Sequence, residues 1–115
     1  MQLSKLETDL LAEFAGDDQC LFEVFAHVRL HTGDDPRAIR TTGRDLLASW
    51  ISRGWLEVVP AFEGDDDPDA ARDISEILPI VDRAKDPAGE YRGASTFLRL
   101  TRRAYDEAPG MSRER

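Results

Sequence analysis

One segment of the chain carries side chains whose types and spacing could bind a metal ion. Cys20, Glu23, His27 and His31 are three, four and four residues apart. Histidines at i and i+4 lie on one face of a helix and can share a metal, which a thiolate or carboxylate can complete. The same stripe is also the polar side of that helix, opposite its phenylalanines, and we prefer this structural interpretation. The sequence therefore predicts no metal and no cofactor.

Carboxylates are concentrated in a second segment. Asp65, Asp66, Asp67 and Asp69 surround Pro68. This cluster lacks the glycine and the terminal glutamate of an EF-hand calcium loop. Neither a phosphate-binding glycine loop nor a nucleophile elbow occurs in the chain, and nothing local pairs two carboxylates for acid–base catalysis. The chain is therefore expected not to be an enzyme, and the four aspartates are candidates for binding a partner.

Basic residues form the third group. The net charge of −8 opposes binding to nucleic acid, yet residues 36–56 and 88–115 each carry net positive charge. Arginine binds phosphate and guanine, and hydroxyl side chains bind phosphate. The candidates for DNA contact are therefore Arg37, Arg40, Thr41, Arg44, Ser49, Arg92, Arg99 and Arg102. Asp45, near the centre of the same helix face, is unfavourable beside phosphate, and the arginines can equally well neutralise the chain's own acids.

The stretch from Ala38 to Val59 must position most of these arginines. It is predicted to form a helix, a glycine stop and a strand. Thr42 is the expected N-cap, Gly54 follows the last turn, and Pro60 ends the strand that starts at Trp55. One side of the helix is apolar and should face the core; it carries Gly43, Leu46, Leu47, Trp50 and Ile51.

Hydrophobic periodicity predicts the remaining elements. Helices are expected at residues 3–15, capped by Ser4, and at residues 19–31, capped by Asp18. Residues 37–40 are expected to form a short turn before the third helix. A fourth helix should follow Asp67-Pro68 and be ended or kinked by Pro79. Residues 95–100 should form a strand that pairs with residues 55–59, and a last helix at 101–107 should be capped by Thr101.

The sequence Arg53-Gly54-Trp55-Leu56, in which a helix runs directly into a strand, resembles the recognition helix and first wing strand of winged helix-turn-helix domains. Leu100-Thr101-Arg102-Arg103-Ala104 resembles the LTxxG that follows the wing in several of these families, with alanine in place of glycine. The resemblance implies an α+β, mostly helical winged helix-turn-helix fold. It would have a three-helix core, a β-hairpin wing carrying a long helical insertion at about residues 61–94, and a short C-terminal helix. Residues 1–108 would form one domain, and residues 109–115 a flexible tail.

Two functions remain open at this point. The resemblance implies a non-enzymatic DNA-binding transcriptional regulator, with a homodimer as an expected assembly. The alternative is an acidic protein–protein interaction module, such as an antitoxin, immunity protein or inhibitor, whose negative charge steers it to a basic protein partner. In that case Asp65, Asp66, Asp67 and Asp69 would bind the partner. The single cysteine and the absence of a long apolar run predict a cytoplasmic protein with no membrane partner.

Overall fold

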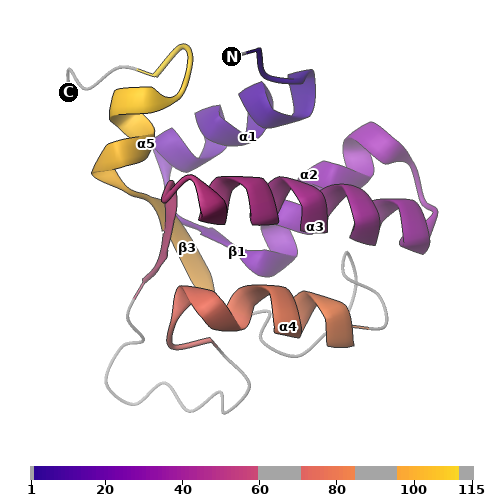
Figure 1. Ribbon diagram of the computed structural model, residues 1–115. Helices are drawn as coiled ribbons and strands as arrows, with labels where there is room; N and C mark the ends of the chain where they lie inside the picture. The colour runs from indigo at the N-terminus through magenta and orange to yellow at the C-terminus, as the bar shows by residue number, and fades with distance from the viewer. Residues whose placement is uncertain (1, 60–70, 85–95, 112–115) are drawn as a thin grey trace.

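The computed structural model describes residues 2–59, 71–84 and 96–111 of the chain. Within these ranges the structure is mostly helical, with one small antiparallel sheet (Figure 1). The elements in chain order are α1 (Lys5–Gly16), β1 (Gln19–Cys20), α2 (Leu21–Thr32), α3 (Pro36–Ser52), β2 (Leu56–Val58), the 3-10 turn η1 (Ile74–Glu76), α4 (Ile77–Arg83), β3 (Phe97–Leu100) and α5 (Arg102–Glu107). None of the helices in the described ranges is both long and apolar enough to span a membrane.

The sheet has the strand order β1-β3-β2, so that the last strand in the sequence is the central one. The predicted pairing of the two longer strands is confirmed, with Leu56 opposite Leu100. Strand β1 was not expected, because residues 19 and 20 had been assigned to the second helix. Gln19 pairs with Leu98 and is buried, and its side-chain amide donates to the carbonyl groups of Glu13 and Asp17. These bonds satisfy the amide inside the protein.

The first helix starts as its sequence predicts, and the third does not. The Ser4 hydroxyl accepts from the backbone N–H of Glu7 at 3.2 Å, and the Glu7 carboxylate accepts in return, which completes a capping box. Helix α3 begins at Pro36, with Asp35 as N-cap, rather than at Thr42. Proline at the first helical position and an aspartate before it are both favourable. The predicted short turn at residues 37–40 is therefore part of one helix of 17 residues.

Two further helix boundaries differ from the prediction. Helix α2 begins at Leu21 with Cys20 as its N-cap residue, so the proposed cap at Asp18 is wrong. The fourth helix does not extend back to Ala71, because residues 74–76 form a 3-10 turn. Pro79 neither ends nor kinks α4, since it occupies the first turn, where no backbone N–H is needed for an intrahelical bond. Asp67 and Pro68 lie outside the described residues.

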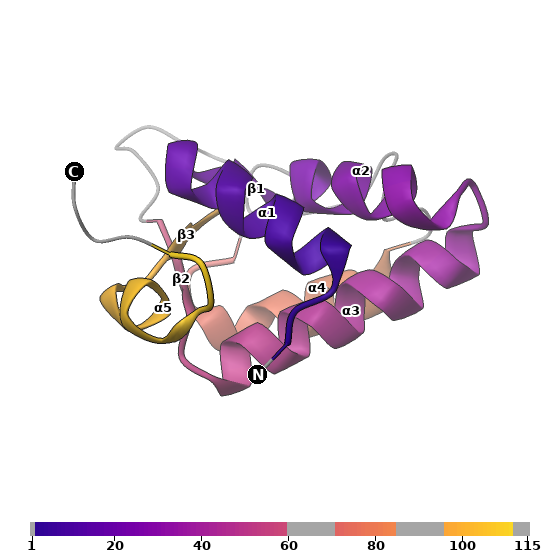
Figure 2. The same ribbon diagram turned by 90° about the horizontal axis from the view of Figure 1, so that it is seen from above.

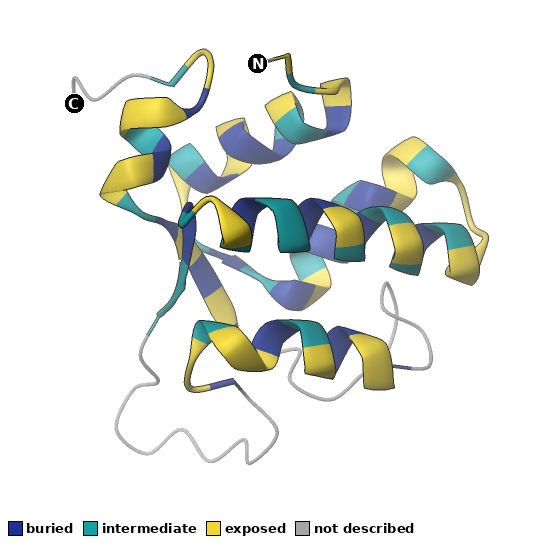
Figure 3. Cartoon of the chain, viewed as in Figure 1, coloured by how far each residue is buried: buried dark blue, intermediate teal, exposed yellow. Residues whose placement is uncertain are grey.

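The core lies around α3, which packs against α2 on one side and α4 on the other (Figures 1 and 2). The predicted apolar side of α3 faces inward, and Trp50 has no exposed surface. The Trp50 ring centroid lies 6.1 Å from that of Phe14 and 6.0 Å from that of Trp55. Helix α4 also contributes to the core, through Ile77, Ile80 and Val81 (Figure 3). Met111, within the predicted tail, packs against the same core.

The chain turns sharply between α3 and β2. Gly54 has a φ of +74°, the left-handed conformation that glycine adopts without steric cost after a helix, as its position predicted. The Gly54 carbonyl accepts from the Thr101 hydroxyl at 2.6 Å, and Thr101 also caps α5 through the backbone N–H of Ala104. One threonine thus fixes both the end of α3 and the start of α5.

Candidate functional site

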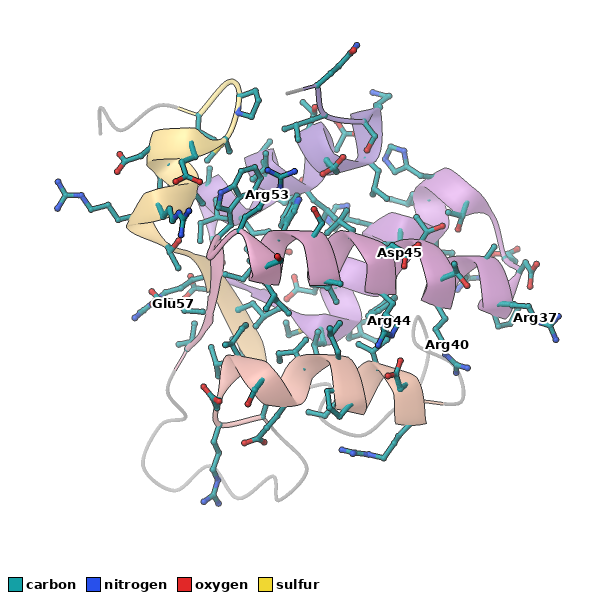
Figure 4. All side chains as sticks on the ribbon, in the orientation of Figure 1. Arg37, Arg40, Arg44, Asp45, Arg53 and Glu57 are labelled. Atoms are coloured by element: carbon teal, nitrogen blue, oxygen red, sulfur yellow. The ribbon has the colours of Figure 1, made fainter. Side chains whose placement is uncertain are left out.

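Two of the α3 arginines proposed to contact DNA point toward α4 (Figure 4). Arg44 donates from Nε to Asp82 Oδ1 at 2.6 Å and from Nη2 to Asp82 Oδ2 at 3.2 Å, a bidentate ion pair. The hydrogen bond from Arg44 lowers the pKa of Asp82 below its usual 3.8, and the same bond raises the pKa of Arg44. Arg40 donates from Nη2 to the carbonyl oxygen of Ala84, directly after α4. Both guanidinium groups therefore bind to α4.

This contact is part of the folded core and not a peripheral docking. Ile77 and Val81 of α4 have no exposed surface, and Ala84 is 7% exposed. Moving α4 away from α3 would bring these side chains into water, at a cost on the order of 1.5–3 kcal/mol for each large aliphatic residue. Helix α4 is accordingly held against α3 in the native state, whereas the side chains of the Arg44–Asp82 ion pair are 41% and 47% exposed.

The outward side of α3 carries a different set of side chains. Arg37, Thr41 and Asp45 are exposed at i, i+4 and i+8. Ser49 is half-buried, and its hydroxyl accepts from Arg53 Nε at 3.4 Å. The Arg53 guanidinium carbon also lies 5.3 Å from the Trp55 ring centroid. The exposed face of α3 thus presents Thr41 between a cation, Arg37, and an acid, Asp45.

The arginines near the sheet and α5 are also largely used within the chain. Arg99 Nε lies 2.6 Å from Glu57 Oε1, and the two residues are directly opposite on β3 and β2. Arg102 is exposed at the first residue of α5. Arg92 lies outside the described residues, as do the four candidate aspartates at positions 65, 66, 67 and 69. Asp82, which binds Arg44, was not a sequence candidate, because nothing local links residues 38 positions apart.

Three of the four residues of the metal hypothesis bind other groups within the chain. The backbone N–H of Cys20 donates to Glu23 Oε1 at 3.1 Å, which caps α2. His31 Nε2 lies 3.1 Å from Asp9 Oδ2 on α1. Burial raises the pKa of the Cys20 thiol, which opposes the thiolate form that metals bind. Within the described ranges, no three His, Cys, Asp or Glu side chains are grouped closely enough to hold a metal ion.

The metal prediction can be tested on the purified protein. Elemental analysis is expected to find no stoichiometric zinc or nickel, because the described structure does not bring Cys20, Glu23, His27 and His31 together around one point. One equivalent of metal that is lost in the His27→Ala/His31→Ala variant would contradict this prediction.

The ion pair between Arg44 and Asp82 makes stability depend on pH. Since the folded-state pKa of Asp82 is lowered, the pair stabilises the fold above the unfolded-state value near 3.8 and loses this contribution as pH falls through the lowered pKa. We expect Asp82→Asn to reduce stability at pH 7 and to flatten the acid side of the stability profile. Urea melts between pH 7 and pH 2 would measure both effects. Parallel profiles for the variant and the parent would contradict the assignment.

An open hollow adjoins the N-terminal part of α3. Its volume is about 470 Å³, and Asp35, Pro36, Arg37, Arg40 and Thr41 line it. The lining thus includes two basic residues and a hydroxyl residue beside an acidic one, Asp35.

Comparison with known proteins assigns neither a family nor a function. No protein-family model matches the chain, and it has no significant match among curated proteins or among solved structures.

Proposed function

We propose that the chain is a non-enzymatic winged-helix-like domain that binds a basic protein partner. The observation that carries this proposal is that Arg40 and Arg44 donate hydrogen bonds to Ala84 and Asp82 of the same chain. A helix that reads DNA needs cations on the side that faces the phosphates. Here the outward ridge of α3 carries one cation, Arg37, which the acid Asp45 offsets on the other side of Thr41.

The order of the elements supports the winged-helix part of the proposal. Three helices precede the strand pair β2–β3, α3 leads directly into β2 at Leu56, and η1 and α4 are inserted between the two strands. The hairpin strands β2 and β3 are antiparallel, and β1, between the first two helices, completes the sheet on the other side of β3. Folds of this kind serve several functions, so the function must be inferred from the residues on the surface and not from the fold.

The charge of the chain supports a basic partner. A net charge of −8 on 115 residues produces a negative field that speeds encounter with positively charged proteins. Asp65, Asp66, Asp67 and Asp69 provide the highest local density of acid in the sequence. We propose that these four residues supply much of the attraction.

Neutralising the aspartates tests this directly. The protein would be immobilised, captured partners identified, and association rates measured at low salt. Asp65→Asn/Asp66→Asn/Asp67→Asn is expected to slow association about tenfold, because steering charges act mainly on the association rate. The matched control Glu13→Gln/Asp17→Asn/Glu76→Gln removes three exposed carboxylates elsewhere. Equal slowing in both triple variants would show that only net charge matters and would remove these aspartates from the site.

DNA binding is the second candidate, favoured by the element order and by the exposed Arg37 and Arg102. Our preferred proposal expects a random-sequence duplex not to be retained, even at low salt, where nonspecific binding is strongest. The DNA proposal expects retention, with log K falling by about 0.9 per log unit of salt for each phosphate contacted. Arg37→Ala should then flatten this slope by about 1, whereas Arg44→Ala should affect it only through stability.

A further inference from the structure

The exposed ridge of α3 carries two opposite charges at equal distances from its centre. Arg37 lies four residues before Thr41, and Asp45 lies four residues after it, so all three are on one ridge of the helix. In Figure 4, Arg37 extends beyond the end of α3, away from the arginines that face α4. Within the described residues, no hydrogen bond or ion pair engages the Arg37 guanidinium or the Asp45 carboxylate. The pKa of the neighbouring Arg44 is raised mainly by its hydrogen bond with Asp82, and the charge of Asp45 also contributes.

We infer that this ridge pairs with the same ridge of a second copy of the chain. A two-fold axis through Thr41, perpendicular to the ridge, reverses the order of the three residues. Arg37 of each copy then faces Asp45 of the other, which gives two reciprocal ion pairs around a contact between the two threonines. At a crossing angle of about 50° the i±4 ridges of two packed helices are parallel, so the three residues of one copy lie along those of the other.

The surroundings of the ridge permit this close approach. Ala38 and Ala48 flank it with small side chains, and α4 draws Arg40 and Arg44 to one side. Arg37 and Thr41 also line a hollow beside the ridge, and Asp35 is part of the same lining. In the inferred pair the Asp45 carboxylate of the second copy accepts charge-assisted hydrogen bonds from Arg37 at this position.

The expected dimer is weak. A contact centred on one pair of helices is smaller than the roughly 800 Å² per partner of a standard interface. Surface ion pairs also contribute little individually. The assembly is independent of the basic partner proposed above, and it would cover the outward face of α3 against DNA.

Charge reversal at the two positions tests the inference on the full chain. Sedimentation equilibrium, at concentrations up to the millimolar range and about 0.15 M salt, would measure the association constant. Arg37→Asp alone and Asp45→Arg alone should each reduce this constant at least tenfold, because each puts like charges opposite each other twice. An equimolar mixture of the two variants should recover it to within about threefold, since the first copy then offers two acids and the second two bases.

A second pair of variants controls for net charge. Arg102→Asp and Glu13→Arg change the charge by the same amounts at exposed positions off the ridge. Neither should weaken self-association tenfold, and their mixture should show no specific recovery. Circular dichroism melts would verify that all four variants fold. A parent chain that stays monomeric over the whole range would overturn the inference, as would a ridge mixture that associates no better than its separate components.

Discussion

Replacing Trp50 with alanine is expected to lower the free energy of unfolding by about 3–5 kcal/mol, the usual range for deleting a large buried aromatic side chain. The Trp50 ring has no exposed surface and packs edge-on against Phe14 and tilted against Trp55. Its indole N–H also donates to Glu7 Oε2 at 3.1 Å, which ties α3 to the first turn of α1. The alanine variant therefore loses both packing and a hydrogen bond, and urea melts would measure the sum.

Two further variants separate these contributions. Trp50→Phe keeps much of the packing and removes the indole donor, so its cost should be well below that of alanine. Leu30→Ala removes an aliphatic side chain that is 79% exposed, and it should change stability by no more than about 0.5 kcal/mol. A loss below about 1 kcal/mol for Trp50→Ala would show that α3 does not pack on α1 as described.

Gly43→Ala is expected to destabilise the protein although alanine is the better helix former. A Cβ atom at this position would lie 2.8 Å from Phe25 Cδ1 and closer still to Phe25 Cε1. The ring or the helix must move, and overpacking of this kind costs about 1–3 kcal/mol or more. The gain in helix propensity, about 1 kcal/mol, offsets only part of that cost. The net effect in urea melts should therefore be a loss of stability.

The clash can be assigned to Phe25 by a double-mutant cycle. Phe25→Leu is expected to cost less in the Gly43→Ala background than in the parent, because it removes the atoms that the new methyl group meets. Gly16→Ala is the matched control, since an added Cβ there meets nothing within 4 Å and the backbone is not left-handed. A Gly43→Ala protein as stable as the Gly16→Ala protein would contradict the close approach of α2 and α3.

The sequence predicted correctly those parts of the fold that depend on residues close together in the chain. The Ser4 capping box, the inward side of α3 and the left-handed Gly54 follow from residues within one or two helical turns of each other. Strand β1 has only two residues, and it exists because Gln19 and Cys20 meet Leu98 and Phe97. No period can be read from two residues, so sequence patterns assigned them to the adjacent helix.

The candidate site shows the same limit more strongly. Arg44 was correctly placed on the third helix and Arg40 was expected in a turn just before it, but the partner of neither side chain could be read from the sequence. Asp82 and Ala84 reach these arginines only because the buried residues of α4 dock that helix against α3. An arginine that reads phosphate and one that binds an internal carboxylate have the same sequence signature.

The central position of β3 has a consequence for synthesis of the chain. Strands β1 and β2 are both edge strands, and neither pairs with the other. The hydrogen bonds between the strands of the sheet therefore cannot form until residues 97–100 have left the ribosome. Up to that moment the nascent chain can form helices, whose bonds are local, but it can form neither of the two strand pairs that the structure describes. The sheet closes in a late step, in which Phe97–Leu100 inserts between two segments that were made long before it.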